Sequence, residues 1–407
     1  MSDHHQHLDR VVRPTLVANL ARYVIMAAVA IAGVPASTTA QPISDAIASE
    51  ATSVAHSQPS AESAYDRVWK RAELYKNDDN DVLQSLVLSG RFQVDLAGVN
   101  ADQGSHDEWN IRRFRFGAKA RLFRHITLHS EGEFNPQERD PFYLRLTDTY
   151  VQWSRSPPLR ITAGKHAAPF TMDGQTSSKE LLTIDRNNLT NNLWYTQEYV
   201  PGVSVSGDHS GWSYHAGVYS GGRRDREFGD FAGSAFMLTS LGYDFGTRLG
   251  VKEATLTGNY VYQDPDPRNT FTNPFRHVAS MNFSLDAGTW GLRTDVAGGD
   301  GTFAQGDLLA VMAMPYYNVT ERAQFVARYT LVSSPHDNAV RLATYERSIV
   351  PGRGDRYNEL FLGFNYFFYG HKLKLQAGLN LADMRDRAND GGAYSGVSGV
   401  LGLRTSW

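Results

Sequence analysis

Cysteine is absent from the 407-residue sequence. Its absence excludes a disulfide framework, thiolate zinc sites, iron–sulfur clusters and cysteine nucleophiles. The sequence also has no excess of positive charge, because 40 Lys and Arg residues stand against 43 Asp and Glu residues and leave a net charge of −3. This balance argues against a protein that binds nucleic acid through a general basic field. Aromatic residues, at 12% of the chain, are too frequent for an unfolded tail.

Long apolar runs are scarce. One run is Tyr23–Val34, and small residues that end at Ala40 follow it. Three arginines precede the run: Arg10, Arg13 and Arg22. This arrangement predicts a secretory signal peptide over residues 1–40, cleaved after Ala40. The alternative, a membrane anchor, would have only about fourteen apolar residues, whereas a spanning helix needs about 20. We therefore expect an exported protein without a helical membrane domain.

Catalytic motifs are missing after the predicted signal peptide. GxSxG, HExxH, P-loop and dinucleotide-binding fingerprints do not occur there. The histidines of the first seven residues lie in the predicted signal peptide, and the others are scattered along the chain. We predict no enzymatic activity, no cofactor and no metal site.

Residues 41–85 have the composition of a periplasmic linker. The first part, 41–60, is rich in Ser, Ala, Pro and Gln, which is typical of a flexible segment. Ala61–Lys76 has apolar residues near one face of a possible short amphipathic helix. The run Asn77–Asn80 would end that helix.

From Leu86 onward, apolar and polar residues alternate. In Asn110–Leu122, phenylalanines and alanines share one face of a strand while arginines and Lys119 share the other. Sixteen segments of this kind, Ile126–Phe134 among them, lie between residues 86 and 407. Short connections such as 123–125 alternate with long ones such as 99–109 and 332–356, which is typical of outer-membrane barrels.

A soluble β-sandwich would also alternate, but three features favour the membrane. The predicted number of strands is large and even, aromatic residues such as Trp153 and Tyr243 stand near strand ends, and the last strand ends with Trp407. We predict an all-β fold: a transmembrane antiparallel β-barrel of about sixteen strands over residues 86–407.

The segment Lys165–Pro201 is the longest connection with structure-like content. Ser177 and Ser178 precede Glu180 in a pattern that resembles a helix N-cap. A connection of this length is more often functional than idle. We expect it to fold into the lumen and to narrow the pore.

Basic residues gather on the predicted inward faces of the first strands and at the foot of the long loop: Arg91, Arg113, Arg115, Lys119, Arg121 and Lys165. Guanidinium groups bind phosphate in a bidentate manner, and a series of them would pass an anion from site to site. The alternative is that these charges are solvated or paired, because Asp95, Glu131 and Glu133 also point inward.

Four segments resemble the phosphate-selective porins of the O and P type: 88–95, 111–134, 148–186 and 357–380. The resemblance covers about residues 86–407. It implies a homotrimer of sixteen-stranded barrels that pass phosphate or polyphosphate along arginines. By motif, Arg112, Arg113 and Arg115 match the arginine-rich second strand of the family, and Lys165 matches the basic residue before a Pro-Phe pair.

We therefore expect an outer-membrane porin of a Gram-negative bacterium. It would allow passive diffusion of small anions, with phosphate or polyphosphate favoured, and it would contact outer-membrane lipid. Two alternatives remain open. One is a general porin, or a porin for sugars or carboxylates, and the other is a non-conducting structural or adhesive barrel.

Overall fold

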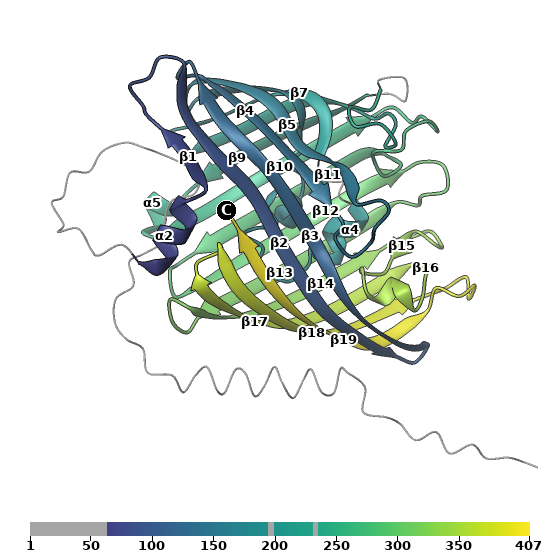
Figure 1. The fold of residues 1–407 in the computed structure, drawn as a ribbon. Coiled ribbons are helices and arrows are strands. Elements are labelled where there is room, and N and C mark those ends of the chain that lie inside the picture. The colour runs from purple at the N-terminus through teal and green to yellow at the C-terminus, as the bar shows by residue number, and fades with distance from the viewer. Residues whose placement is uncertain (1–62, 194–198, 231–234) are drawn as a thin grey trace, which may run out of the picture.

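The computed structural model describes residues 63–193, 199–230 and 235–407. Within these residues, sixteen antiparallel strands close into a barrel (Figure 1). The predicted signal peptide, residues 1–40, and the linker up to residue 62 lie outside the described residues. In the part of the chain that is described, no helix has the length and apolarity needed to cross a membrane.

The barrel strands follow one another in sequence order around the ring, each paired antiparallel with its neighbour. Their bounds are β2 (Leu83–Ala101), β3 (Gly104–Leu122), β4 (Ile126–Phe134), β5 (Tyr143–Ser156), β6 (Leu159–Ala167), β7 (Tyr199–His209), β8 (Trp212–Ser220), β9 (Ala235–Asp244), β10 (Glu253–Gln263), β11 (Phe275–Asp286), β12 (Trp290–Gly301), β13 (Leu308–Asn318), β14 (Ala323–Ser333), β17 (Arg356–Tyr369), β18 (Leu373–Arg385) and β19 (Tyr394–Ser406).

The last strand closes the ring on the first. β19 pairs with β2 from Gly396 opposite Ala101 to Ser406 opposite Arg91. Closure leaves no open strand edge within the ring, which is a requirement for strands that lie in lipid. The predicted all-β antiparallel barrel of about sixteen strands is thus confirmed.

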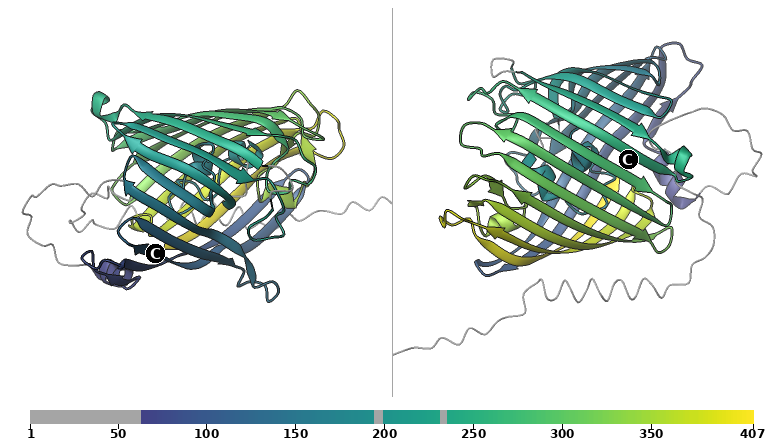
Figure 2. Two further views of the ribbon diagram at one scale, coloured as in Figure 1. Left: turned by 90° about the horizontal axis from the view of Figure 1, so that it is seen from above. Right: turned by 180° about the vertical axis from the view of Figure 1, so that it is seen from behind.

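The outer face of the barrel is apolar, as the alternation predicted. In β13, Leu309 is 60% exposed and Val311 is 36% exposed, whereas Ala310 and Met312 between and beside them are fully buried. The buried residues face inward and belong to an apolar cluster that includes Leu189 of helix α4 (Asn188–Leu193). The core therefore lies inside the barrel, between the strands and a segment folded against them (Figure 2).

The predicted connection at 99–109 is wrong. β2 and β3 continue through it, with Leu96 opposite Trp109 and Ala101 opposite Gly104, and only residues 102–103 form the turn. The two strands are therefore longer than the sequence indicated, because their residues remain paired up to the two-residue turn.

The N-terminal helix is shorter than expected. Helix α2 (Ala64–Lys70) begins with a capping box between Ser63 and Asp66. The chain then forms strand β1 (Glu73–Lys76), which pairs with β2 outside the closed ring. A short helix α5 (Gly246–Leu249) lies in the connection between β9 and β10.

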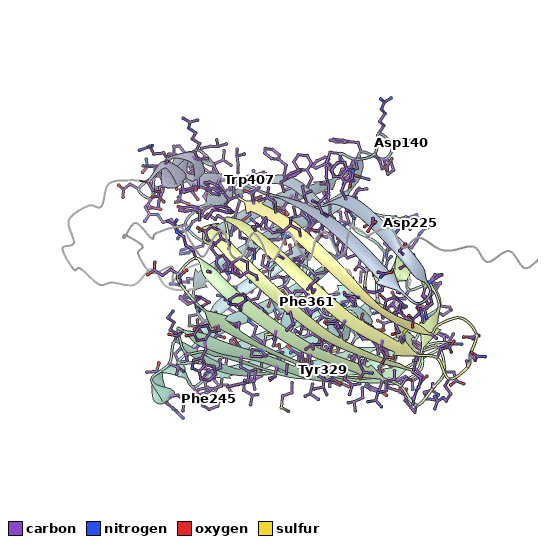
Figure 3. The ribbon with its side chains drawn as sticks, turned by 90° about the horizontal axis from the view of Figure 1, so that it is seen from below. Asp140, Asp225, Phe245, Tyr329, Phe361 and Trp407 are labelled. Carbon is purple, nitrogen blue, oxygen red and sulfur yellow. The ribbon has the colours of Figure 1, made fainter. Side chains whose placement is uncertain are left out.

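The two ends of the barrel differ. Short turns, helix α2 and the C-terminus lie at one end, and the long connections lie at the other; Figure 3 labels Trp407 towards the first end and Asp225 at the second. In one of the long connections, strands β15 (Val340–Arg341) and β16 (Arg353–Gly354) pair, and a 3-10 helix η2 (Glu346–Ser348) lies between them.

Candidate functional site

The connection between β6 and β7 crosses the barrel interior. Its main chain bonds to side chains of the opposite wall: the carbonyl oxygens of Leu181, Leu182 and Ile184 accept hydrogen bonds from Lys374 (2.6 Å), Asn365 (2.8 Å) and Arg404 (3.2 Å), respectively. We call residues 168–193 the lumen loop. These three carbonyl groups are thus satisfied by the wall, as buried backbone groups require.

The lumen loop contains helices, but not where the sequence placed one. Helix α3 (Met172–Gln175) is capped by the Thr171 hydroxyl, and α4 follows at Asn188. Ser177–Glu180, predicted to open a helix, form a turn. The carbonyl groups of the next residues bond to the barrel wall, so they are not available for helical hydrogen bonds.

A second connection also folds inward, although the sequence indicated only that it is long. Residues 334–355 reach the lumen loop and the wall: Thr344 donates to Asp185 (2.8 Å), Tyr345 donates to Asp95 (2.6 Å), and the Arg341 amide donates to Asn192 (2.8 Å). We call this segment the upper loop. Val340, Leu342 and Tyr345 are buried, although they belong to a long connection rather than to a strand of the barrel. Apolar residues in a long connection are the signal that could have revealed it.

Arg112 and Arg113 both point into the lumen because the strand is bulged there. Gln93 of β2 pairs with Arg113 and Val94 pairs with Ile111, which leaves Arg112 as the extra residue. Arg112 Nη2 lies 3.3 Å from Asp185 Oδ1 of the lumen loop, and Arg113 donates to Gln93 Oε1 (2.9 Å).

The Asp185 carboxylate is held ionised by these arginines. Burial alone would raise its pKa, but Arg112, Arg113, the Thr344 hydroxyl and the Arg186 amide together hold the pKa of Asp185 well below its usual range. One negative charge of the lumen loop thus lies permanently beside two positive charges of the wall.

Three of the other predicted residues are paired with acids. Arg91, 5% exposed, lies 3.4 Å from Glu131 and also bonds Ser178. Arg115 is fully buried and bonds Glu133 (2.9 Å) and the Tyr199 hydroxyl (2.9 Å). Lys165, 4% exposed, lies 2.9 Å from Glu227, a residue of the connection after β8. The inward acids thus pair with many of the bases.

Lys119 and Arg121 lie apart from that group. Both are exposed, and Arg121 donates to the Arg124 carbonyl (3.2 Å) in the short turn after β3. The predicted basic stripe is therefore divided: Arg112 and Arg113 meet the lumen loop, Arg115 is part of the wall, and Lys119 and Arg121 lie towards the short-turn end.

A group of four arginines at the long-loop end was missed by sequence reasoning: Arg224, Arg341, Arg347 and Arg353. Burial and the like charges of Arg353, Arg347 and Arg224 lower the pKa of Arg341 to about 10. Within the described ranges, no ion pair joins any of the four to a carboxylate. We call them the arginine cluster. Their density in the segment 341–353 was visible in the sequence.

Residues 87–288 match the family of phosphate-selective porins O and P. The resemblance to this porin family that the sequence indicated is thus confirmed over these residues. No curated protein matches the chain. Its fold is similar to those of the anion-selective porin from Comamonas acidovorans (TM-score 0.57, 14% identity, 79% of this chain and 99% of that chain) and the outer membrane channel DcaP of Acinetobacter baumannii (0.53, 13%, 82% and 100%). It is also similar to OmpT of Vibrio cholerae (0.52, 12%, 79% and 97%).

In this porin, the basic residues are spread along the barrel rather than gathered in one pocket. The arginine cluster lies at the long-loop end, Arg112 and Arg113 lie beside the lumen loop, and Lys119 and Arg121 lie towards the short-turn end. Among the described residues, no group of three or more His, Asp or Glu residues could hold a metal ion. The chemistry available at these residues is reversible binding of anions by guanidinium and ammonium groups.

Proposed function

We propose that this outer-membrane porin conducts small anions passively, with phosphate or polyphosphate as the favoured solute. The observation that carries the proposal is the arginine cluster. Like charges repel, so four arginines that form no ion pair with any carboxylate of the described residues are disfavoured unless an anion or water screens them. A pore entrance lined by charges of one sign also raises the local concentration of ions of the opposite sign.

Arg112 and Arg113 would provide the next contact for an anion that has entered. Arg112 is partly exposed, with 28% of its side chain accessible, and Asp185 competes for it. A solute with two charged oxygens can replace Asp185 on the guanidinium by bidentate hydrogen bonds. Lys165 is a weaker candidate, because a solute must displace Glu227 from its ammonium group.

The selectivity of the pore tests the proposal. We expect Arg341→Gln/Arg347→Gln to move the reversal potential in a KCl gradient towards cation preference. Arg248→Gln/Arg322→Gln removes the same charge from two exposed residues at the short-turn end and should shift it much less. A wild-type pore that prefers cations, or equal shifts in both variants, would contradict the proposal.

Phosphate preference needs a separate measurement. Inorganic phosphate should block the chloride current of the wild-type porin, and Arg112→Gln/Arg113→Gln should weaken that block. Block by sugar instead would favour the sugar-porin alternative, and the absence of any open pore would favour a structural or adhesive barrel. Conduction without phosphate block would leave a general anion porin. No catalytic activity is part of this proposal.

We also propose export through a signal peptide cleaved after Ala40, and assembly as a homotrimer. The basic residues and apolar run of the first 40 residues support the first point. The trimer form of the V. cholerae protein, similar in fold at a TM-score of 0.51, supports the second. N-terminal sequencing of the porin from outer membranes should start at Gln41, and its native mass should equal three chains.

A further inference from the structure

A recess of about 640 Å³ lies among three of the long connections. Its lining comes from residues 263–274, from residues 303–305 and from the upper loop. Pockets that hold small organic ligands have volumes of about 300–1,000 Å³. The recess is therefore large enough for a ligand with a ring.

Apolar groups form part of the lining. Phe303 is 64% exposed, and Pro267 and Pro274 line the recess with it. An aromatic ring left open to water on a long connection is available to cover the apolar body of a ligand.

The backbone at Phe303 is held in an unusual conformation. Its φ of 56° lies in the left-handed region, which bulky residues rarely adopt. The turn is fixed on both sides, because the Thr302 amide donates to the Pro274 carbonyl (2.8 Å) and the Gln305 amide donates to the Thr302 carbonyl (3.1 Å). Asn338, across the recess, also has a φ of 56°. Such conformations are concentrated at ligand-binding sites.

The charge available in the recess is positive. Arg353 donates through Nη1 to Gln305 Oε1 (3.0 Å), and no carboxylate of the described ranges forms an ion pair with it. Burial lowers the pKa of the Arg353 guanidinium. The acid that lines the recess, Asp266, is already bonded by Arg268 at 2.8 and 3.1 Å. A partly buried guanidinium thus faces a recess whose own acid is neutralised.

We propose that this recess binds a small organic monoanion with an apolar ring, its carboxylate on Arg353 and its ring against Phe303. A sugar would need several free hydrogen-bonding groups, but the Gln305 and Asn269 amides are already bonded within the protein. Inorganic phosphate would bring a large hydration shell against the apolar lining. An aromatic carboxylate can bond the Arg353 guanidinium through its carboxylate and pack its ring against Phe303.

Direct binding of benzoate to the full-length porin in detergent, by calorimetry, tests this inference. We expect saturable binding of one benzoate per chain, and about tenfold weaker binding for Phe303→Ser and for Arg353→Gln, because one charged hydrogen bond or one ring contact is lost. Arg322→Gln, which removes an exposed guanidinium in the short turn between β13 and β14, should keep the wild-type affinity. Benzamide, the neutral analogue, should bind much more weakly than benzoate.

The inference and the proposed pore selectivity fail separately. Phe303→Ser should weaken benzoate binding by the stated factor but keep the wild-type reversal potential in KCl, since Phe303 lies outside the arginine cluster. Equal binding of benzamide and benzoate would overturn the inference. The inference would also be overturned if Phe303→Ser and Arg353→Gln both bound benzoate with wild-type affinity. Heat-modifiable gel mobility shows that each variant has folded as a barrel. Benzoate binding to a pore without anion preference would support the recess and contradict the pore proposal.

Discussion

Arg112 Nη2 of strand β3 lies 3.3 Å from Asp185 Oδ1 of the lumen loop. The two side chains remain 28% and 20% exposed, so water and solutes reach the pair. Exposed ion pairs contribute little to stability because water screens them. Under the proposed function the pair would act through its charge, because Asp185 would reduce the positive charge that Arg112 and Arg113 present to a passing ion.

Removal of the Asp185 charge should increase anion preference. In Asp185→Asn, Arg112 and Arg113 lose their acidic neighbour while the side chain keeps its size and an oxygen that accepts from Thr344. We expect the reversal potential in a KCl gradient to move further towards chloride. Asp81→Asn, which changes an 88% exposed carboxylate paired with Arg124 at the short-turn end, is the matched control. A larger shift in the control would mean that Asp185 does not lie on the ion path.

The selectivity should also depend on pH through Lys179 of the lumen loop. Lys179 donates to the main-chain oxygen of Trp407 (3.1 Å), and burial together with Arg91 lowers its pKa to about 8, although Glu131, Asp148 and Glu180 oppose the shift. Deprotonation above pH 8 removes a positive charge, so anion preference should fall between pH 7 and 9. Lys179→Arg keeps the charge and should give a flat profile. An equal fall in both proteins would assign the titration to another group.

The same shift has a consequence for stability with a definite sign. The unfolded chain holds the Lys179 proton up to about pH 10.5, whereas the folded chain releases it near pH 8. Between these values the unfolded state binds more protons, so the contribution of this group to the free energy of unfolding rises with pH. Urea titrations at pH 7.5 and 9.5 should show a smaller rise for Lys179→Arg than for the wild-type porin.

Local patterns were sufficient to predict a barrel of about sixteen strands, although they misplaced the turn between β2 and β3 and did not identify β1. The period of two located Ile126–Phe134 without error, because each residue of a barrel strand meets either lipid or the interior. The same pattern hid the bulge at Arg112. Ile111 and Phe114 both face outward although they are three residues apart, and that break in the period is the trace that a bulge leaves in a sequence.

Contacts between a long connection and a distant barrel strand could not be predicted from the sequence. Glu227 reaches Lys165 from 62 residues away, and Tyr345 reaches Asp95 from 250 residues away. Neither contact leaves a periodic signal, because a long connection carries no register that fixes where its side chains fall. The charges of the wall could therefore be located from the sequence, but their pairing could not.

The face assignment of β19 predicts where arginine is tolerated. Leu401 lies opposite Leu96 of β2, which is 42% exposed on the outer face. Leu401→Arg should cost about 2–4 kcal/mol if the residue lies near the bilayer midplane. Leu401→Phe keeps an apolar side chain and is the control. Heat-modifiable gel mobility after folding into lipid vesicles measures the effect, and equal folding of both variants would place Leu401 away from lipid.

The N-terminal segment fastens the two strands that close the barrel. Trp69 of α2 donates from Nε1 to the Ser406 carbonyl (2.6 Å) at the end of β19, and its ring centroid lies 5.2 Å from that of Tyr369 at the end of β17. Tyr65 stacks on the same Tyr369 at 5.4 Å. Strand β1, a few residues later, pairs with β2. One short segment thus contacts both sides of the closure between β19 and β2 (Figure 1).

Trp69→Ala should therefore weaken the closed barrel. The variant loses one hydrogen bond, worth about 1 kcal/mol, and an aromatic contact worth about 0.5–1.5 kcal/mol, so the loss should be roughly 1–3 kcal/mol. Trp109→Ala makes the same substitution at a 59% exposed residue at the long-loop end of β3 and should cost less. The temperature at which the barrel loses its heat-modifiable gel mobility measures both effects. If Trp69→Ala unfolds at the wild-type temperature, α2 only rests on the barrel and closure depends on the β19–β2 ladder alone.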